Sequence, residues 1–594
     1  MSNLSISGKK WIYKKFDATY VNFLKENFFL DEITAKLLSI RNIDKTYVET
    51  FLKPSIKNLI PNPNILRDME KTTKRILTAI KKKEKIGIFG DYDVDGASST
   101  ALIGNYLQLI KQDFEVYIPD RKTEGYGPSI ESFQKLIQKE VNLIITVDCG
   151  TMSFDAIEFA NQNNIDVIVL DHHQSEITLP KAYSIINPNR TDDQSKLNYL
   201  CAAGVCFMTL ISINSTLRKI NWFVDNKIQE PNLLDFLDLV SLGTICDVVP
   251  LIGLNRAIVK QGLKIINLKK NLGLKTLIDL CKIETRASTY HLGYIIGPRI
   301  NAGGRVGKCS HGAKLLLNNN PRESFKIASE LNQFNTERKK LEKNLLNIVL
   351  NTIKNDIDDP VLVLQGNDWH EGIIGIIASR IKEKFNKPTI IISLNNKIGK
   401  ASARSILGFD IGEVILAAVQ KKILIKGGGH KMAGGFSIQE DKIQKFKEFI
   451  IKRFKSKLDN NIDKNNLYLD STISVSALNY DFYQKIDKLS PFGSGNPEPK
   501  FILENVKVLK SLIVGENHIK SILISPDGSI LKTISFNSFE TDLGQFLLNN
   551  KTNNFNVVGK LSLNEWKGEK NVEFIIDDIS VIKNQKNKVP SSIG

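Results

Sequence analysis

The 594-residue sequence has no apolar run of about 18 residues, the length that a membrane-spanning helix requires. Residues 1–16 mix polar and basic side chains and lack the apolar core of a secretory signal. The six cysteines are scattered without any Cys-x-x-Cys pair, which argues against a zinc site or a disulfide framework. We therefore expect a cytoplasmic protein without a membrane segment, with reduced and mostly buried thiols.

Acidic residues are the minority among the charged ones: 81 lysines and arginines against 64 acids give a net charge of +17. A basic surface of that size indicates a polyanionic partner, nucleic acid first and an anionic membrane second. A lysine-biased composition without any binding role is the alternative. Hydrophobic residues at 42% and charged residues at 24% exclude wholesale disorder. The length predicts about three or four domains.

Three carboxylates, Asp91, Asp93 and Asp95, follow a short apolar run and precede a helical pattern at residues 97–109. Like charges this close repel one another, and each is costly to desolvate without a cation nearby. A bound metal ion is the simplest explanation. An acidic turn that only caps the helix is the alternative, because Asp is a common N-cap.

Apolar runs alternate with helical segments in this part of the chain, which is typical of a parallel α/β sheet. The runs occupy residues 86–89, 114–118, 143–147 and 167–170. Each is followed by polar or ionisable groups: the acid cluster, then Asp120-Arg with Glu124-Gly-Tyr-Gly127, then Asp148, then Asp171-His-His173. Since the carboxyl ends of parallel strands meet at one edge of a sheet, these groups are predicted to form one site.

Two further segments offer candidate residues. An apolar helix at residues 233–245 ends in Asp247, which is equally well explained as a helix cap or as a buried ligand. Residues 294–307 are predicted to form a small-residue loop in which Arg299 and Arg305 contact phosphate, although a plain turn with solvated arginines explains it nearly as well.

Residues 321–355 have no internal Pro or Gly and are predicted to form one long helix that links two domains. A second α/β unit follows from residue 361. It contains two predicted loops suited to phosphate: residues 402–405, with Ser402 and Arg404, and the glycine-rich segment 427–435. In the latter the backbone amides of Gly428 and Gly429 are predicted to form an anion nest beside His430.

Short strand patterns fill the region after about residue 456, with turns such as Pro526-Asp-Gly528 between them, and predict a small antiparallel, OB-like barrel. Such barrels bind single strands through basic grooves and aromatic platforms. Four aromatic candidates are equally explained as platform or core: Tyr480, Phe482, Tyr483 and Phe492. The polar tail, residues 583–594, is predicted to be frayed.

The predicted ligands are mostly oxygen donors with one or two imidazoles and no thiolate: Asp93, Asp95, Asp148, His172 and Asp247. Such a set suits Mn²⁺ or Mg²⁺ better than a structural zinc ion. Four carboxylates carry enough charge for two divalent ions. Two ions about 3.5 to 4 Å apart can promote in-line hydrolysis of a phosphodiester or phosphoanhydride.

Several motifs resemble known ones. Gly90-Asp-Tyr-Asp-Val-Asp-Gly96, Val147-Asp-Cys-Gly150, Asp171-His-His173 and Gly243-Thr-Ile-Cys-Asp-Val-Val-Pro250 resemble, in order, the motifs of the DHH phosphoesterase superfamily. Gly427-Gly-Gly-His430 with Gly434-Gly435 resembles its DHHA1 companion domain. Together with Trp369-His-Glu-Gly-Ile-Ile-Gly375, Pro491-Phe-Gly-Ser-Gly-Asn-Pro497 and the barrel, they make the chain resemble the RecJ family of bacterial single-strand-specific 5′-to-3′ DNA exonucleases.

The resemblance implies a role for each candidate. The five ligands named above would hold two metal ions, with Asp148 bridging them. His173 would contact the scissile phosphate, and Asp91 would orient its neighbours. The substrate-phosphate candidates are Ser402, Arg404, His430, Gly428 and Gly429, with Arg299 and Arg305 as weaker ones. One departure is Phe89, where some relatives have a histidine that could reach a metal.

The resemblance also implies an architecture: an N-terminal helical lead-in (1–75), a DHH domain with a parallel sheet (76–320), a connecting helix (321–356), a DHHA1 α/β domain (357–455), an OB-like barrel (456–585) and a tail (586–594). The first two α/β domains would face each other across a channel too narrow for duplex DNA. The expected substrate is single-stranded DNA in repair and recombination, handled by a monomer, with single-strand-binding protein and a helicase as partners by analogy.

Two alternatives remain open. The first is a DHH-type phosphodiesterase for short oligonucleotides or cyclic dinucleotides, against which the predicted barrel argues. The second is an inactive DHH-type single-strand DNA-binding replication subunit, against which the complete set of acids and histidines argues.

Overall fold

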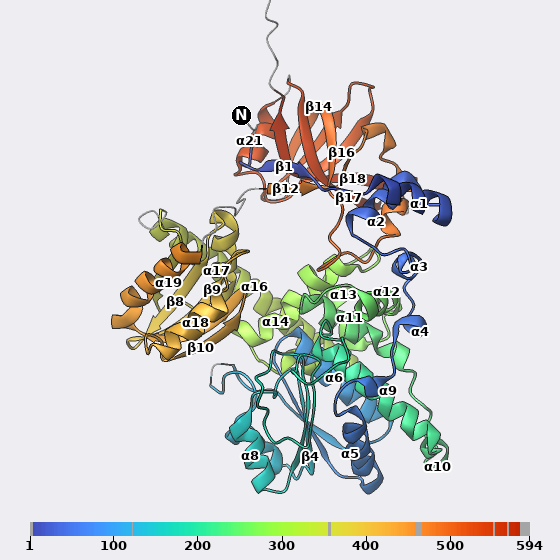
Figure 1. Cartoon of the computed structure of the whole chain (residues 1–594), viewed down its shortest axis with the longest axis vertical. Coiled ribbons are helices and arrows are strands. Elements are labelled where there is room, and N and C mark those ends of the chain that lie inside the picture. The colour runs from blue at the N-terminus through green and yellow to red at the C-terminus, as the bar shows by residue number, and fades with distance from the viewer. Residues whose placement is uncertain are drawn as a thin grey trace, which may run out of the picture. The chain divides into compact units, whose positions relative to one another are not determined.

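The structure, a computed structural model, describes residues 4–121, 123–353, 358–457, 466–550, 553–566 and 569–582 (Figure 1). The chain divides into two compact units. The smaller contains Met1–Leu59, Pro250–Lys260 and Asp463–Gly594, and the larger contains Ile60–Val249 and Gln261–Ile462. The predicted tail, 583–594, lies outside the described residues. No helix of the part described is both long and apolar enough to cross a membrane.

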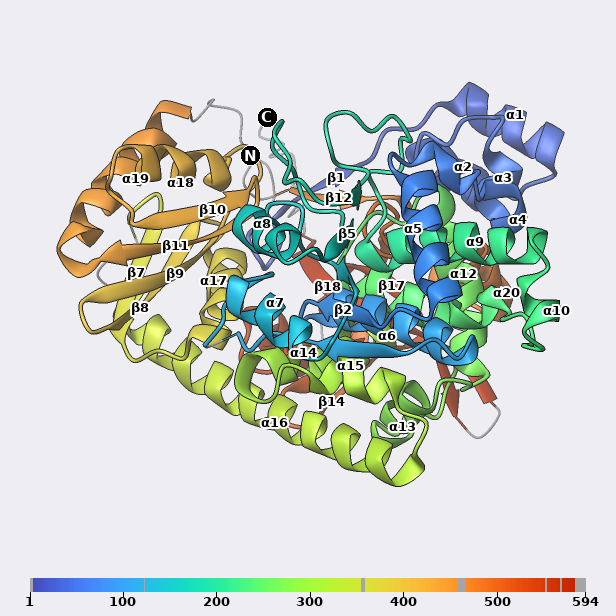
Figure 2. The same cartoon turned by 90° about the horizontal axis from the view of Figure 1, so that it is seen from below.

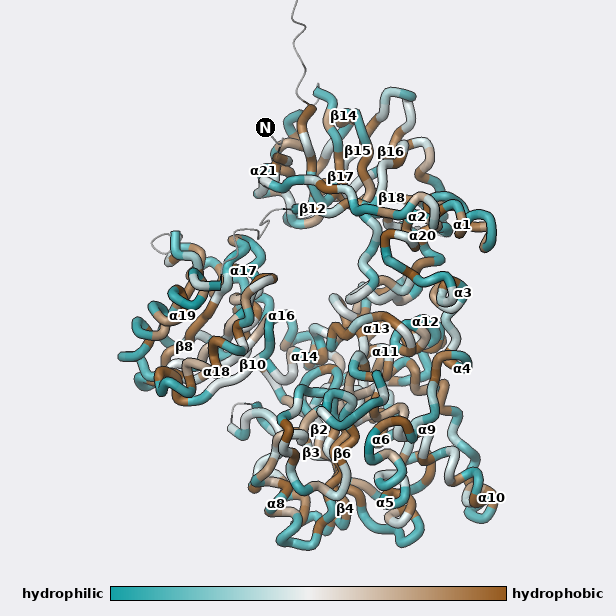
Figure 3. The backbone as a smooth tube through the Cα atoms, viewed as in Figure 1, coloured by the Kyte–Doolittle hydropathy of each residue, from teal (hydrophilic) through white to brown (hydrophobic). Residues whose placement is uncertain are grey.

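The first sheet of the larger unit has five parallel strands in the order β3-β2-β4-β5-β6. They are β2 (Ile86–Gly90), β3 (Phe114–Tyr117), β4 (Leu143–Val147), β5 (Asp166–Leu170) and β6 (Ser184–Ile186). Four of them match the predicted apolar runs. The fifth, β6, has only three residues, which are too few to show a hydrophobic pattern in the sequence. β2 and β4 are buried along their whole length, as expected for strands covered on both faces. Their residues are largely apolar, and Figure 3 colours the chain by hydropathy.

Helices cover this sheet: α5 (Met69–Lys82), α6 (Val94–Leu109), α7 (Ile130–Ile137), α8 (Phe154–Gln162) and α9 (Ala202–Lys219). Phe89, the residue that departs from some relatives, has no exposed surface and lies in an apolar cluster with residues of α7 and α8. Its ring stacks on Tyr117 at 5.7 Å between centroids and meets Phe133 edge-on at 5.8 Å. Phe89 therefore contributes to the core.

A helical layer follows, with η2 (Leu233–Phe236), α11 (Leu237–Cys246), α12 (Gly253–Asn267), α13 (Leu272–Leu280), η3 (His291–Ile296), α14 (Gly297–Val306) and α15 (His311–Leu317). The loop predicted at residues 294–307 is wrong, because this segment is the π-helix η3 followed by α14. Its small residues serve helix packing. A Cβ on Gly297 would lie 2.5 Å from Cys246 Sγ, and one on Gly304 would lie 3.0 Å from the Tyr92 ring.

The predicted long helix is present as α16 (Pro321–Thr352), an unbroken helix of 32 residues (Figure 2). Pro321 occupies its first turn, and the Asn320 side chain caps it by accepting from the backbone N–H groups of Arg322 and Glu323. α16 packs against α13, α14 and α15 and then against α17 (Glu371–Phe385). It therefore joins the helical layer to the second sheet.

The second sheet has the order β10-β11-β9-β8-β7, in which only β7 and β8 are parallel. Its strands are β7 (Leu362–Asn367), β8 (Thr389–Asn395), β9 (Ile398–Arg404), β10 (Lys426–His430) and β11 (Ala433–Gln439). Two helices accompany α17, namely α18 (Ile411–Gln420) and α19 (Ile443–Lys457). This second sheet and its helices form an α/β domain, as predicted.

Both loops predicted in this unit are wrong. Ser402 and Arg404 lie on β9, and the glycine-rich segment forms the antiparallel pair β10–β11, in which Gly428 faces Gly435. No glycine from 427 to 435 has a positive φ, so the backbone cannot alternate handedness as an anion nest requires. A Cβ on Gly434 would lie 2.4 Å from Ile415 of α18. The glycines therefore let a helix pack closely on the sheet.

The smaller unit contains a closed barrel, which confirms the predicted OB-like fold. Its strands are β14 (Phe501–Val514), β15 (His518–Ile524), β16 (Ile530–Ser535), β17 (Phe555–Trp566) and β18 (Glu569–Val581). They run in the order β14-β15-β16-β18-β17, and β17 pairs with β14 to close the barrel. β16 and β18 are parallel, and α21 (Asp542–Asn549) comes between β16 and β17 along the chain.

The N-terminal segment belongs to the same unit as the barrel. β1 (Lys10–Tyr13), which was not predicted, pairs in parallel with β12 (Asn466–Leu469). Short helices follow: α1 (Ala18–Phe28), α2 (Glu32–Ile40), α3 (Val48–Leu52) and α4 (Ile56–Leu59). Leu24, Leu37 and Phe51 lie in one apolar cluster with the barrel residue Phe501. The lead-in therefore shares a core with the barrel.

The aromatic candidates lie near this core. Phe482 and Tyr483, on α20 (Tyr480–Asp487), and Phe492 are partly buried and pack against the cluster. The Tyr480 ring contacts the Lys570 ammonium, with Nζ 5.1 Å from the ring centroid. Three of the four are therefore chiefly core residues.

Candidate metal centre

Side chains from four separate segments converge at the carboxyl edge of the parallel sheet. Asp91 follows β2, Asp148 follows β4, His172 follows β5, and Asp247 caps the end of α11. The alternation of strand and helix brings them together, because each parallel strand ends at the same edge. Asp148 adopts a φ of 61°, in the left-handed region that Asp tolerates better than most residues.

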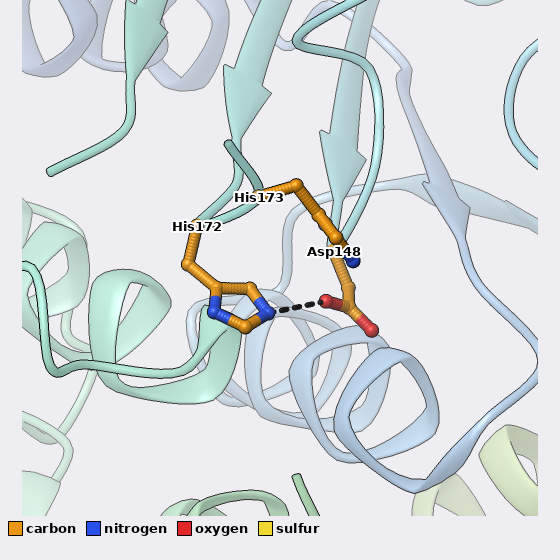
Figure 4. A group of neighbouring side chains, drawn as sticks. All are labelled: Asp148, His172 and His173. Atoms are coloured by element: carbon orange, nitrogen blue, oxygen red, sulfur yellow. Dashed lines mark ion pairs between the residues drawn. The ribbon is translucent and has the colours of Figure 1, made fainter. Parts of the chain in front are cut away.

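The Nε2 atom of His172 is the meeting point of three carboxylates. It lies 3.3 Å from Asp148 Oδ1, 3.5 Å from Asp247 Oδ2 and 3.9 Å from Asp95 Oδ2. Figure 4 shows the His172 ring directed at the Asp148 carboxylate, with His173 beside them. This arrangement offers one nitrogen and several oxygens to a shared point.

The cluster contains further groups of possible ligands. One carboxylate oxygen each from Asp91, Asp93 and Asp148 falls within 4.8 Å of the others, and the same limit holds for Asp95, His172 and Asp247. Asp148 also groups with the two histidines. Asp148 therefore belongs to two of the three groups, and its bridging of two ions stays a prediction. Asp91 is brought into the cluster itself, although the resemblance gave it only an orienting role.

Three atoms of this cluster are buried without any hydrogen-bond partner: Asp91 Oδ1, Asp148 Oδ1 and His172 Nε2. Buried polar atoms are rarely left unpaired, and an unpaired charge costs several kcal/mol. A cation bound among them would satisfy all three at once. The donors are hard oxygens with one imidazole, so the residues fit divalent ions such as Mn²⁺ or Mg²⁺.

The shifted pKa values of the clustered side chains agree with a site that binds a cation. Burial, followed by the neighbouring carboxylates, raises the pKa of Asp148 well above its usual range. Burial, Asp95 and Asp93 likewise raise the pKa of Asp247 to about 8. Burial lowers the pKa of His172, so its imidazole is held neutral, the form that binds metal.

Comparison with known proteins supports this reading. Residues 85–244 match the model of the DHH family, N-terminal domain, residues 336–456 match the DHHA1 domain, and residues 469–578 match the RecJ OB domain. The Single-stranded-DNA-specific exonuclease RecJ of Haemophilus influenzae is 34% identical over 545 residues, which cover 89% of this chain and 93% of that protein. The chain belongs to the RecJ family.

Other relatives agree with that assignment. The RecJ protein of Escherichia coli is 33% identical over 89% of this chain and 92% of its own length. A crystal structure of RecJ in complex with Mn²⁺ from Thermus thermophilus matches with a TM-score of 0.79, at 26% identity over 96% of this chain and 80% of that one. A structure of exonuclease RecJ bound to manganese is 30% identical, with a TM-score of 0.56, over 68% of this chain and 96% of that one.

Local interactions position the acids of this RecJ-family site. Asp93 caps α6, and its Oδ1 accepts from the Gly96 N–H at 2.9 Å. The Asp95 carboxylate accepts from the N–H groups of Ala202 at 2.6 Å and Ala203 at 3.1 Å, at the start of α9. A Cβ on Gly243 would lie 2.4 Å from Asp95 Oδ1. That glycine therefore leaves room for the carboxylate.

Asp171, to which no role was assigned from the RecJ-family motif, holds both histidines in place. Its Oδ1 accepts from the backbone N–H of His172 at 2.7 Å and lies 2.7 Å from His173 Nδ1. Its Oδ2 accepts from the Thr151 N–H at 3.1 Å. Burial acts to lower the pKa of His173, but the bond and charge of Asp171 outweigh it and raise the pKa to about 9. His173 is therefore held as an imidazolium.

Other residues that hold the histidines and Asp148 in place were not predicted from the sequence, because single polar residues in loops give no periodic signal. Asn187 Nδ2 donates to the His173 carbonyl at 2.8 Å, and the Asn189 amide donates to the His172 carbonyl. The Tyr126 hydroxyl donates to the Asp148 carbonyl at 3.1 Å, and its ring meets His173 edge-on with centroids 5.9 Å apart. Tyr126 does lie in a motif that the sequence singled out.

Replacing Asp171 with asparagine should lower kcat by about 10- to 100-fold, the usual cost of losing a residue that orients a site. The amide can no longer hold His173 as an imidazolium. Single-turnover hydrolysis of labelled single-stranded DNA at saturating Mn²⁺ measures this loss. Asp155→Asn on the exposed side of α8 is the matched control. A kcat for Asp171→Asn equal to that of the control would show that the contact has no role.

The phosphate candidates gather between the helical layer and the second sheet. Arg404 Nε donates to Ser379 Oγ at 3.2 Å and its Nη1 to Ser402 Oγ at 3.2 Å. Arg305 Nη1 donates to the Gly372 carbonyl at 3.0 Å, at the start of α17. Hydroxyls and guanidinium groups from three elements thus lie in one region of this RecJ-family chain.

Positive charge in this region is poorly compensated. Burial, followed by the charges of Arg121, Arg338 and Arg404, lowers the pKa of Arg305 to about 10, with Asp93 as the acid that opposes it. Arg338 pairs with Glu342 at 2.7 Å. Guanidinium groups that repel one another favour an anion between them. Arg121 lies in the Asp120-Arg pair that was predicted to join the site at the sheet edge, but it was not predicted to bind phosphate.

The remaining candidates are placed as follows. His430 is exposed at the end of β10, and burial, Arg404 and His173 lower its pKa. Arg299 donates from Nη1 to the Ile295 carbonyl of η3 at 2.6 Å and from Nε to Asn332 Oδ1 on α16 at 3.0 Å. Roles in phosphate binding for these residues and for Gly428 and Gly429 stay predictions.

Proposed function

We propose that this protein is a metal-dependent exonuclease that hydrolyses the phosphodiester bonds of single-stranded DNA from the 5′ end. The observation that carries the proposal is the buried cluster of carboxylates around His172, with three unpaired polar atoms, in a chain of the RecJ family. The relatives are named as single-stranded-DNA-specific exonucleases, and solved members were crystallised with Mn²⁺ or Mg²⁺.

The metal ions would be held by the cluster: Asp93, Asp95, Asp148, His172 and Asp247, with Asp91 in reach of the same site. When bound, two divalent ions supply an activated water and neutralise charge on the reacting phosphate. The His173 imidazolium donates a hydrogen bond to a phosphate oxygen and stabilises the charge that develops there. Asp171 keeps that ring oriented and protonated.

Directionality follows from the arginines. Arg404 and Arg305, with Arg121 nearby, would bind the terminal 5′-phosphate, which carries more charge than an internal phosphodiester. An end held at a fixed distance from the metal cluster limits cleavage to the adjoining nucleotides. The 5′-to-3′ direction thus depends on these arginines, which hold the 5′ end of the strand.

The barrel unit would bind the strand further along, in the manner of other OB folds. We place the enzyme in DNA repair and recombination in the cytoplasm, acting as a monomer on strands that a helicase opens and single-strand-binding protein covers. The barrel favours this substrate over short oligonucleotides or cyclic dinucleotides, because those need no second binding unit.

End-labelled single-stranded DNA incubated with the protein and Mn²⁺ or Mg²⁺ should be degraded progressively, and EDTA should abolish the reaction. A duplex of the same sequence with blunt ends should resist. The products are resolved on a denaturing gel as a function of time. Degradation that continues in EDTA, or that prefers the duplex, would refute the proposed function.

A further inference from the structure

The linking helix α16 carries a buried carboxylate with two arginine partners. Glu342 Oε2 lies 2.7 Å from Arg338 Nη1 on the same helix, and Glu342 Oε1 accepts from Arg380 Nε of α17 at 3.1 Å. The side chains of Glu342 and Arg338 are each only 11% exposed. A buried ion pair adds little net stability, because desolvation offsets its attraction. Its effect therefore lies in the geometry that it imposes on the two helices.

Arg338 is the fixed end of this network. Its Nε and Nη2 atoms donate to Asn335 Oδ1 at 3.2 and 2.9 Å, and Asn335 is itself buried. With Nη1 on Glu342, all three nitrogens of Arg338 have partners on α16. The charges of Arg338 and Arg380 repel each other, and the carboxylate of Glu342 between them offsets that repulsion. Glu342 thus joins Arg380 of α17 to a fixed point on α16.

α17 is also attached at its first turn. Arg305 Nη1 of α14 donates to the Gly372 carbonyl at 3.0 Å. A Cβ on Gly372 would collide with the Arg305 carbonyl, so the close approach of the two backbones requires glycine. Gly372 belongs to the Trp369–Gly375 motif, to which the proposed function gives no role. α17 is therefore held by α14 at its first turn and by α16 at its third.

Between these two attachments, α17 supports the phosphate candidate Arg404. Ser379, the residue before Arg380, accepts from Arg404 Nε at 3.2 Å. A Cβ on Gly375 would lie 3.0 Å from Ser402 Oγ and 3.2 Å from Arg404 Nη2, so α17 lies directly against both side chains. A shift of α17 relative to α16 would therefore move the Arg404 guanidinium.

We infer that Glu342 is a positioning residue which, by holding Arg380 of α17 to Arg338 of α16, sets the place of the Arg404 guanidinium relative to the metal cluster. The inference rests on the proposed function, because it takes Arg404 as the group that binds the terminal 5′-phosphate. It adds that an ion pair of the linking helix fixes the distance between that phosphate and the metal cluster, and with it the position of cleavage.

The test compares labelled single strands that end in a 5′-phosphate or a 5′-hydroxyl, with the full-length protein and Mn²⁺. Glu342→Gln keeps the shape of the side chain and removes its charge. It should lower kcat/KM on the phosphorylated strand about tenfold and leave the hydroxyl end nearly unchanged, since a displacement of about 1 Å costs up to about 100-fold. The first products of the phosphorylated strand should also become mixed in length.

Two further variants keep the test independent of folding. The Arg380 side chain is 58% exposed, so Arg380→Gln removes the same contact from α17 without disturbing a core, and it should reproduce the loss. The double variant should lose little more than Glu342→Gln alone, because both changes break one contact. Glu337→Gln, at an exposed position of the same helix, is the matched control and should behave as the wild type.

The outcomes separate the inference from the proposed function. Wild-type protein that cleaves both kinds of end equally would overturn the proposed role of the arginines, and the inference with it. A wild-type preference for the phosphate that persists in Glu342→Gln and Arg380→Gln would overturn the inference alone. An equal loss on both ends, a loss of Mn²⁺ affinity in Glu342→Gln, or the same loss in Glu337→Gln would also overturn it. If Glu342→Gln does not fold, Arg380→Gln decides by the same criteria.

Discussion

Asp148→Asn should lower the rate of single-stranded DNA hydrolysis by about 10,000-fold, which corresponds to about 5.5 kcal/mol of transition-state stabilisation. Asp148 belongs to two of the three groups of possible ligands, and its Oδ1 lies 3.3 Å from Nε2 of His172, which also belongs to the third, so its loss should affect the whole cluster. Asparagine is preferred to alanine, because it tolerates the φ of 61° at this position and keeps the shape of the turn. Rapid-quench assays with labelled single strands measure the loss.

The same variant should bind single-stranded DNA nearly as well as the wild type in the presence of EDTA, because the barrel and the arginines are untouched. Asp368→Asn is a matched control: Asp368 is exposed and also has a positive φ, 53°. Its activity should be that of the wild type. Hydrolysis by Asp148→Asn within tenfold of the control would mean that the assigned ligand set is wrong.

Arg404→Ala should lower kcat/KM on 5′-phosphorylated single strands by about 100- to 1,000-fold, the scale of losing a preorganised group that binds phosphate oxygens. Arg404 is held by Ser379 and Ser402 with its guanidinium close to Arg305, so a lysine cannot replace its planar fork. Arg404→Lys should therefore recover only part of the loss. Steady-state kinetics on strands of defined length provide the measurement.

Strands that end in a 5′-hydroxyl provide the decisive comparison. The wild type should prefer the phosphorylated end, and Arg404→Ala should lose that preference while cleaving the hydroxyl end about as well as the wild type does. Arg453→Ala on α19 is the control for removing an arginine from the same domain. A variant that is slowed equally on both ends would show that Arg404 acts on something other than the terminal phosphate.

Much of the metal centre could be predicted from the sequence. Asp91, Asp148 and His172 each follow an apolar run, and parallel strands bring such positions to one edge whatever the details of packing. The barrel was predictable for a similar reason, because β14 and β15 show strand patterns between clear turns. In both cases a pattern of neighbouring residues is sufficient, because it predicts a strand whatever the distant parts of the chain do.

Other features depended on contacts between distant segments. Residues 294–307 and 427–435 are rich in glycine, which predicts loops when the neighbours are unknown. They form a helix and a β-hairpin, because Cys246 and Ile415 occupy the space where side chains would be. The role of Asp91 changed for the same reason: only the fold places it within reach of Asp93 and Asp148.

The sequence by itself was enough to predict the chemistry of this protein. Its acids and paired histidines, each placed after an apolar strand, indicate a divalent-metal phosphoesterase of the DHH type. The tertiary structure decided how that chemistry is held. It placed Asp171 in hydrogen-bond contact with both histidines and brought Arg121 close enough to Arg305 for their charges to interact. Spacing along the chain specifies local structure, whereas contacts between residues hundreds of positions apart arise only when the chain packs.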